Sequence, residues 1–300
     1  MIANLLILYE VPALGVQLAV DGILIGAVFA LAAYGMALVW GVTNIINVAQ
    51  GEFVMLGGFI AIAGVEHGVP LLLAVPLAAA ALYALGWLLY YAVIVHLIGR
   101  DMFISVLATF GIAIVLQQLM AHVFGSVERI AASPLGSWFF LDGLVSIDKM
   151  KVAAFAVCIG LGIVLALFLS RSRQGQAIRA VAQKPQAANA LGIDTHKVYR
   201  LTFALNAAIC GAAGALAASA YTIHAYGGLS YTIRSFMIVV VAGIGNLAGV
   251  IWAALILGAA ENFAGFILGA QYQIAFVFGL LVAVLVFRNW RLRRQRSRLE

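Results

Sequence analysis

The chain has 300 residues, of which 65% are hydrophobic and 9% charged, with a mean hydropathy of +1.10. A soluble domain of this length needs no such apolar fraction for its core, so the composition excludes a soluble globular protein and indicates a multi-pass membrane protein. The formal net charge of +6 is concentrated in two segments, and this asymmetry bears on orientation.

Apolar runs fill most of the chain without period-2 alternation, which predicts helices as the spanning elements. We expect an all-α polytopic membrane protein, a single transmembrane domain over residues 1–300, with about eight transmembrane helices, some broken by glycine-rich or polar segments. No Lys or Arg precedes Arg100, so we expect the first run to be kept as a span and not removed as a signal peptide. The runs cover roughly residues 12–40, 53–65, 69–98, 102–125, 152–170, 201–223, 235–268 and 273–287.

Residues 41–52, between the first two runs, carry Asn44, Asn47, Gln50 and Glu52 but no Lys or Arg. Non-helical backbone at membrane depth is tolerated only when it is buried in protein or lines a watery cavity. We therefore expect this segment to line something wet. Glu52 has two interpretations, because an acid at this point can serve function or can complement the dipole of the following helix in its first turn.

Residues 126–150 form the largest segment expected outside. Their Trp138-Phe139-Phe140 run is compatible with an interfacial helix.

Residues 171–200 form a basic interlude with six Lys or Arg and one acid, Asp194, which the positive-inside rule places in the cytoplasm. Pro185 suits the first turn of a short helix, and Gly192 lies just past its end. Such a short helix is marginal alone, so something must support it. Ala187, Ala188 and Leu191 share one face, and this patch either docks in a groove of another protein or packs back on the chain's own spans.

The long run 235–268 contains the glycine-rich stretch 243–249, where a helix can break. Because the basic loop and the tail share the cytoplasmic side, an even number of crossings must separate them, and we split the run at this point. Whether the run crosses twice or re-enters stays open. Glu261, further along, is an acid at apolar depth and a candidate for function.

The tail, residues 288–300, is a basic cytoplasmic segment with six Arg. Arg beside a membrane span is typical of an anchor to anionic lipid headgroups, which we favour over nucleic-acid binding.

Several chemistries lack their motifs. No Lys completes a P-loop, and no H-E-x-x-H motif is present, so we expect neither nucleotide hydrolysis nor a metalloprotease, and no metal or cofactor in this chain. Cys158 and Cys210 lie inside apolar runs and are expected to be packing residues. Asp21, near the start of a span, is interpreted as structural.

Four blocks of sequence stand out: residues 22–27 continuing through 39–53, residues 173–180 leading into Ala187-Ala188 and 191–194, residues 240–249, and residues 257–261. Together these blocks resemble the branched-chain amino acid ABC transporter permeases of the Liv type, H subunit. The resemblance implies a non-enzymatic subunit of a bacterial inner-membrane importer working by alternating access. It also implies a second permease subunit, two cytoplasmic ATPase subunits that bind the ATP, and a periplasmic binding protein.

The same resemblance assigns two sets of residues. The expected ATPase-coupling residues are Ala187, Ala188, Leu191, Gly192 and Asp194, and the expected translocation-path residues are Asn44, Asn47, Gln50, Glu52, Gly243, Gly245, Asn246 and Glu261.

Gln50 stands where the family often has His, which leaves the cargo open between branched-chain amino acids and urea, short amides or other small organic acids. A self-sufficient secondary carrier that uses Glu52 or Glu261 as a proton site is the alternative from another class.

Overall fold

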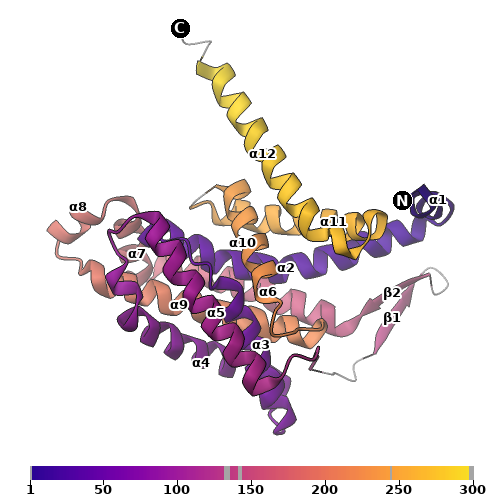
Figure 1. Ribbon diagram of the computed structural model, residues 1–300, viewed down its shortest axis with the longest axis horizontal. Coiled ribbons are helices and arrows are strands. Elements are labelled where there is room, and N and C mark those ends of the chain that lie inside the picture. The colour runs from indigo at the N-terminus through magenta and orange to yellow at the C-terminus, as the bar shows by residue number, and fades with distance from the viewer. Residues whose placement is uncertain (1, 132–135, 141–143, 244, 297–300) are drawn as a thin grey trace.

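The structure, a computed structural model, describes residues 2–131, 136–140, 144–243 and 245–296 (Figure 1). Helices make up most of the described chain. They are α1 (Ile2–Glu10), α2 (Pro12–Thr43), α3 (Gln50–Glu66), α4 (Leu71–Ala92), the 3₁₀ turn η1 (Ile94–His96), α5 (Met102–Phe124), α6 (Lys149–Arg171), α7 (Arg173–Gln183), α8 (Pro185–Ala190), α9 (Thr195–Ala220), α10 (Gly228–Ala242), α11 (Leu247–Leu268), the 3₁₀ turn η2 (Ala270–Tyr272) and α12 (Gln273–Arg296). The last four residues of the predicted basic tail, 297–300, lie outside the described residues.

Seven of the described helices are long and apolar enough to cross a membrane, and α10, with 15 residues, is a shorter apolar helix. The 17-residue α3 adds a further short helix after the polar segment. This arrangement confirms the predicted all-α polytopic membrane fold, with a helix count close to the expected eight.

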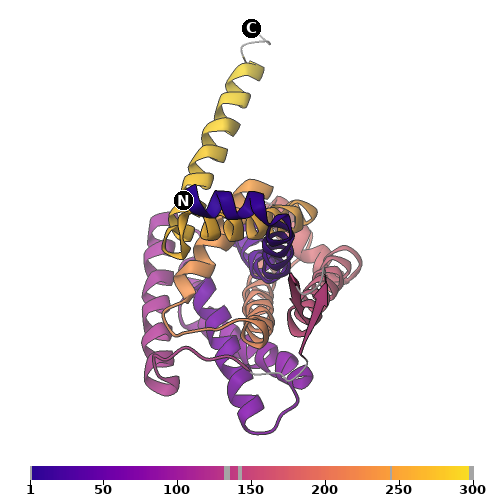
Figure 2. The same ribbon diagram turned by 90° about the vertical axis from the view of Figure 1, so that its right-hand side faces the viewer.

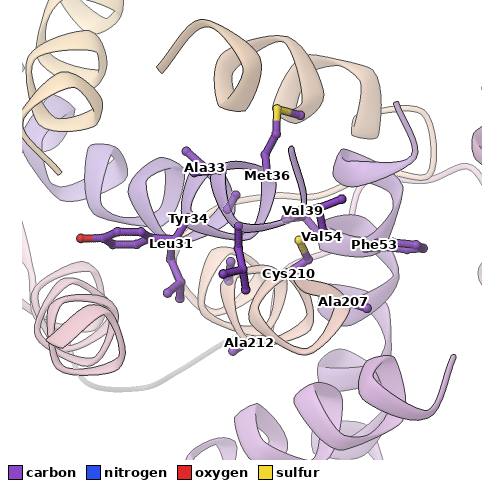
Figure 3. Close-up of a cluster of buried hydrophobic side chains, with 14 of the residues drawn as sticks. Leu31, Ala33, Tyr34, Met36, Val39, Phe53, Val54, Ala207, Cys210 and Ala212 are labelled. Atoms are coloured by element: carbon purple, nitrogen blue, oxygen red, sulfur yellow. The ribbon is translucent and has the colours of Figure 1, made fainter. Parts of the chain in front are cut away.

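Helices α2 and α9 form the centre of the bundle. In their most apolar 18-residue windows 89% and 78% of residues are buried, against 22% in both α4 and α5 and 11% in the window at α12. Small residues in α9, such as Ala207 and Ala212, let the neighbouring backbones approach closely. Figure 3 shows side chains of α2, α3 and α9 meeting in this core.

The two ends of the bundle differ (Figure 1). Helices α7 and α8 lie at one end. Helix α1 and the strands β1 (Ser137–Phe140) and β2 (Val145–Asp148) lie at the other, with α2 running between the two ends. Figure 2, turned by 90°, shows α12 projecting from the body of the bundle. We call the end with α7 and α8 the loop end, and the end with α1 and the two strands the hairpin end. The positive-inside rule predicts that the loop end faces the cytoplasm.

At the hairpin end the interfacial helix considered for residues 126–150 is absent from the described part of that segment, which forms an antiparallel pair, β1 (Ser137–Phe140) and β2 (Val145–Asp148). Aromatic and β-branched residues favour strands, which explains the difference. The Gln17 side chain of α2 holds the hairpin by accepting a bond from Ser146 N at 2.9 Å and donating to Ser146 O at 2.8 Å. Asp21, which we interpret as structural, pairs with Lys151 at 2.9 Å.

The predicted break in the run 235–268 is present between α10 and α11. Gly243 and Gly245 have φ values of +85° and +87°, a backbone conformation that glycine adopts without strain. Asn246 then caps α11 by accepting a bond from Gly249 N at 3.0 Å. Four helices, α9 to α12, follow the basic loop; three of them are long and apolar enough to cross a membrane, and α10 is shorter. The even number of crossings between loop and tail therefore stays a prediction.

Candidate translocation path and coupling surface

The polar segment after α2 is held by threonine hydroxyls from two distant helices. Asn44 ends α2 in the left-handed conformation, with φ at 58°. Val48 N donates to Thr109 Oγ1 of α5 at 3.1 Å, and Thr232 Oγ1 of α10 donates to Val48 O at 3.0 Å. These bonds satisfy backbone groups that would otherwise be costly inside a bilayer.

Helices α3 and α10 begin at the same place, which we call the α3/α10 junction (residues 47–52 with residues 228–232). Gly51 packs directly on the carbonyl of Gly228, because a Cβ at Gly51 would overlap that oxygen. Gly51 N also donates to Thr232 Oγ1 at 2.9 Å. Two helix N-termini, each with a partial positive charge, therefore meet inside the bundle.

Glu52 lies at this meeting point. Its side chain is buried, with 3% exposed, and its carboxylate contacts Gly228 at the start of α10. Among the described residues its Oε2 atom has no hydrogen-bond partner. A carboxylate is electrostatically favoured beside two helix N-termini. Glu52 can therefore complement the dipole of α10 as well as that of α3. Its Oε2 atom, without a partner among the described residues, is compatible with a binding role.

Gln50 and Asn47 belong to the same buried network. Gln50 Nε2 donates to Ala32 O at 2.8 Å and to Cys210 Sγ at 2.9 Å, and Asn47 Oδ1 accepts from Ala49 N at 3.2 Å. Both side chains are almost fully buried, at 0% and 1% exposed. Polar backbone at this depth can be buried in protein or can line a watery cavity, and in the single chain these two side chains are buried in protein.

Glu261 is engaged in a buried ion pair with Arg234. Arg234 Nε donates to both carboxylate oxygens, at 3.0 and 2.8 Å, and its Nη2 also contacts Oε1. The guanidinium lies over the Phe29 ring at 5.1 Å from the centroid. The pair joins α10 to α11 and gives the buried Glu261 carboxylate a cation.

Gly243, Gly245 and Asn246 lie at the loop end, away from the junction. Gly245 shares a cavity of about 290 Å³ with Gly41 of α2 and with Arg179 of α7. The predicted path residues are thus divided among three places: the junction, the Arg234–Glu261 pair, and the loop end, which also holds Asn44 at the end of α2.

Helix α8 is stabilised by its own caps. Pro185 occupies its first position, and Gly192 has φ of +86° just past its end. Ile193 N donates to Ala188 O and Gly192 N to Asn189 O, both at 3.0 Å, which is the Schellman pattern. The predicted short helix is confirmed, with its end at Ala190.

The predicted coupling residues face in different directions. Ala188 is buried against the chain's own helices at 3% exposed, so its side chain cannot meet a partner in this conformation. Leu191 is 83% exposed, and Ala187 and Gly192 are exposed too. One residue of the patch therefore packs on the chain's own helices and the others form an exposed face, so docking in a partner's groove stays a prediction.

Asp194 caps α9. Its Oδ1 accepts from Lys197 N at 3.0 Å. That backbone bond, followed by the hydrogen bond and charge of the Lys197 side chain, lowers the pKa of Asp194 below its ordinary value.

Sequence reasoning missed Arg234, Thr109 and Thr232. Arg234 was detectable, because an acid such as Glu261 at apolar depth needs a cation and Arg234 is the basic residue inside the C-terminal bundle. The two threonines carried no such signal, since a lone Thr in an apolar helix most often bonds its own backbone.

Fold and site together define a multi-pass membrane protein with broken helices inside and a helical loop exposed at one end. A family model described as "Branched-chain amino acid transport system / permease component" matches residues 18–285. The chain belongs to this permease family.

Curated relatives agree. The chain is 33% identical to the high-affinity branched-chain amino acid transport system permease protein BraD of Pseudomonas aeruginosa, covering 91% of this chain and 93% of BraD. It is 30% identical to the permease protein LivH of Escherichia coli K12, covering 89% and 91%. A solved structure, PsaBC from Streptococcus pneumoniae in complex with Fab, aligns with 88% of this chain and 89% of its own at 11% identity and a TM-score of 0.43.

Proposed function

We propose that this chain is a permease subunit of an ATP-driven importer that passes branched-chain amino acids across the bacterial inner membrane by alternating access. Membership in the permease family supports the transport class. The observation that carries the coupling role is α8, a capped helix between two spans with Leu191 83% exposed. An exposed leucine on a short rigid helix suits a shallow groove in a partner.

The proposed partners supply nucleotide hydrolysis, for which this chain has no P-loop motif, and delivery of the cargo. Two cytoplasmic ATPase subunits bind ATP and receive α8, a second permease subunit completes the pathway, and a periplasmic protein delivers the cargo. In this scheme the chain contributes path and coupling without covalent chemistry, and membrane lipid surrounds its exposed helices.

Helix α10 provides a mechanical link between the two predicted sites. One end packs on Glu52 at the junction, and the other ends at Gly243, next to the cavity that Gly245 shares with α7. Movement of the loop toward or away from the ATPases would therefore shift α10 and change the junction that Asn47, Gln50 and Glu52 form. A two-state displacement of this kind is the usual basis of alternating access.

A thiol at Leu191 tests the coupling role. Both native cysteines, Cys158 and Cys210, are buried, so Leu191→Cys adds an exposed thiol to a chain without another. We expect a photoreactive maleimide on this thiol to crosslink the ATPase subunit in membranes. Ala188→Cys is the matched control, because its side chain is buried three residues away and should give little product. Labelling of Leu191→Cys with no ATPase captured contradicts the proposal.

A secondary carrier remains the second candidate because of one observation: the buried Glu52 carboxylate keeps an oxygen without a partner among the described residues. Liposomes separate the two. The chain alone should not move leucine under a proton gradient, whereas the full assembly with ATP and the binding protein should. Uptake by the chain alone would favour the carrier, and ATP-driven uptake of urea or short amides instead of leucine would revise only the cargo.

A further inference from the structure

A cavity of about 350 Å³ at the loop end differs in chemistry from the apolar cavities of the bundle. It lies between α4, α7 and the first turns of α9. Its walls include Tyr83, Trp87, Gln174, Lys197, Arg200 and Leu201. Cationic, amide and aromatic groups thus face one space at the rim of the membrane-spanning bundle.

The charge in this cavity is positive. Lys197 and Arg200 are one turn apart on α9, and the Lys197 side chain is 72% exposed despite its ion pair with Asp194 at 3.3 Å. Arg200 bonds to the Tyr91 hydroxyl and lies over that ring at 5.5 Å, which orients the guanidinium. No carboxylate within the described parts of the chain lies at ion-pair distance from Arg200. Because guanidinium carries five donors, Arg200 keeps donors for an anion.

Two apolar cavities follow further along α4 and α9, and we treat them together with the first cavity as one groove. One turn beyond Tyr83 and Leu201 lie Ala79 and Leu205, which line a second cavity of about 250 Å³. That cavity shares Ala79, Leu161 and Ala212 with a third of about 560 Å³. From Trp87 to Leu72 the groove follows α4 for about 22 Å, longer than the ~15 Å of one leaflet's hydrocarbon.

We propose that this groove binds one anionic phospholipid of the leaflet at the loop end. Its phosphate lies between Lys197 and Arg200, and an acyl chain runs along α4, α9 and α6. Basic pockets between spanning helices recognise such headgroups, and Trp87 and Tyr83 suit the headgroup boundary. The apolar continuation favours a lipid over a soluble phosphate, which would occupy only the first cavity.

The bound lipid has a mechanical consequence. Lys197 follows α8 by seven residues, and Gln174 belongs to α7, so the headgroup would brace both ends of the loop. This role is independent of which cargo the chain carries.

Native mass spectrometry of the delipidated full-length protein tests the site with phosphatidylglycerol and phosphatidylcholine. We expect the wild type to retain one phosphatidylglycerol in preference to phosphatidylcholine. Lys197→Gln with Arg200→Gln should weaken that binding about 30-fold, from two charges lost near the surface. Arg171→Gln with Arg173→Gln is the matched control, since both arginines are exposed and neither lines the groove.

A second variant tests the apolar part of the groove and leaves its charged residues unchanged. Ala208→Phe fills the second cavity and should also reduce binding, with an unchanged unfolding temperature confirming the fold. Equal retention of both lipids, or full retention by the double Gln variant, overturns the proposal. Displacement of the lipid by soluble glycerol phosphate, with no effect of Ala208→Phe, would also overturn it in favour of a phosphate site.

Discussion

The α3/α10 junction and the basic loop, residues 171–200, are held by hydrogen bonds of different range. The junction depends on residues far apart in sequence: the bond from Val48 to Thr109 spans 61 positions and that from Gly51 to Thr232 spans 181. The loop depends on neighbours, since Gly192 and Asp194 act within three positions of their partners. The helix ends of the loop are thus fixed by short-range bonds, even though Ala188 packs on neighbouring helices, whereas the junction at membrane depth needs partners from the whole bundle.

The largest expected effect breaks the junction at its closest contact. Gly51→Ala places a methyl group against the Gly228 backbone carbonyl, which cannot move aside as a flexible side chain could, so we expect a loss of more than about 3 kcal/mol, above the usual range for overpacking, and impaired transport, measured by unfolding in detergent and by uptake. Gly111→Ala in α5 is the matched control, because its Cβ meets nothing within 4 Å. There the helix should gain up to about 1 kcal/mol. Equal effects at the two glycines would show that the junction is not tightly packed.

The next effect concerns the charge pair beside the junction. Arg234→Met leaves Glu261 buried without its cation and should cost about 3 kcal/mol in the same unfolding measurement, toward the lower end for a broken buried pair. Adding Glu261→Leu removes the stranded charge and should recover most of the loss. If the double variant is no more stable than Arg234→Met, the pair contributes through packing on Phe29 and Tyr231 and not through charge.

Sequence patterns predicted the loop closely because its determinants are local. Pro185 and Gly192 delimited a helix within one residue of the observed end, and 243–249 gave the break between α10 and α11. The inward turn of Ala188 was not predictable, because helical spacing gives a shared face without saying what covers it.

The junction could be predicted only in part. Polar residues between apolar runs correctly indicated a non-helical segment after α2, since buried backbone must be satisfied. Its partners could not be inferred, because Thr109 and Thr232 look like any threonine in an apolar helix. Grouping Gly243, Gly245 and Asn246 with Glu52 rested on the family resemblance, and the fold separates them by the length of α10.

The smallest expected effect is the pH dependence of the Asp194 cap in the loop. The lowered pKa of Asp194 means that its capping contribution is full above the ordinary Asp value of 3.8 and is lost as pH falls through the folded-state pKa. Hydrogen exchange at the Lys197 amide should therefore show protection at pH 7 that declines toward pH 3, after correction for intrinsic rates. Asp194→Ala should lose this protection at both pH values, whereas Asp194→Asn should keep a cap that does not depend on pH, because the amide oxygen still accepts the bond. The junction residues should show no change in any of these variants. A loss of protection at Gly51 in Asp194→Ala would mean that the loop and the junction fold as one unit, against the independence argued from their hydrogen bonds.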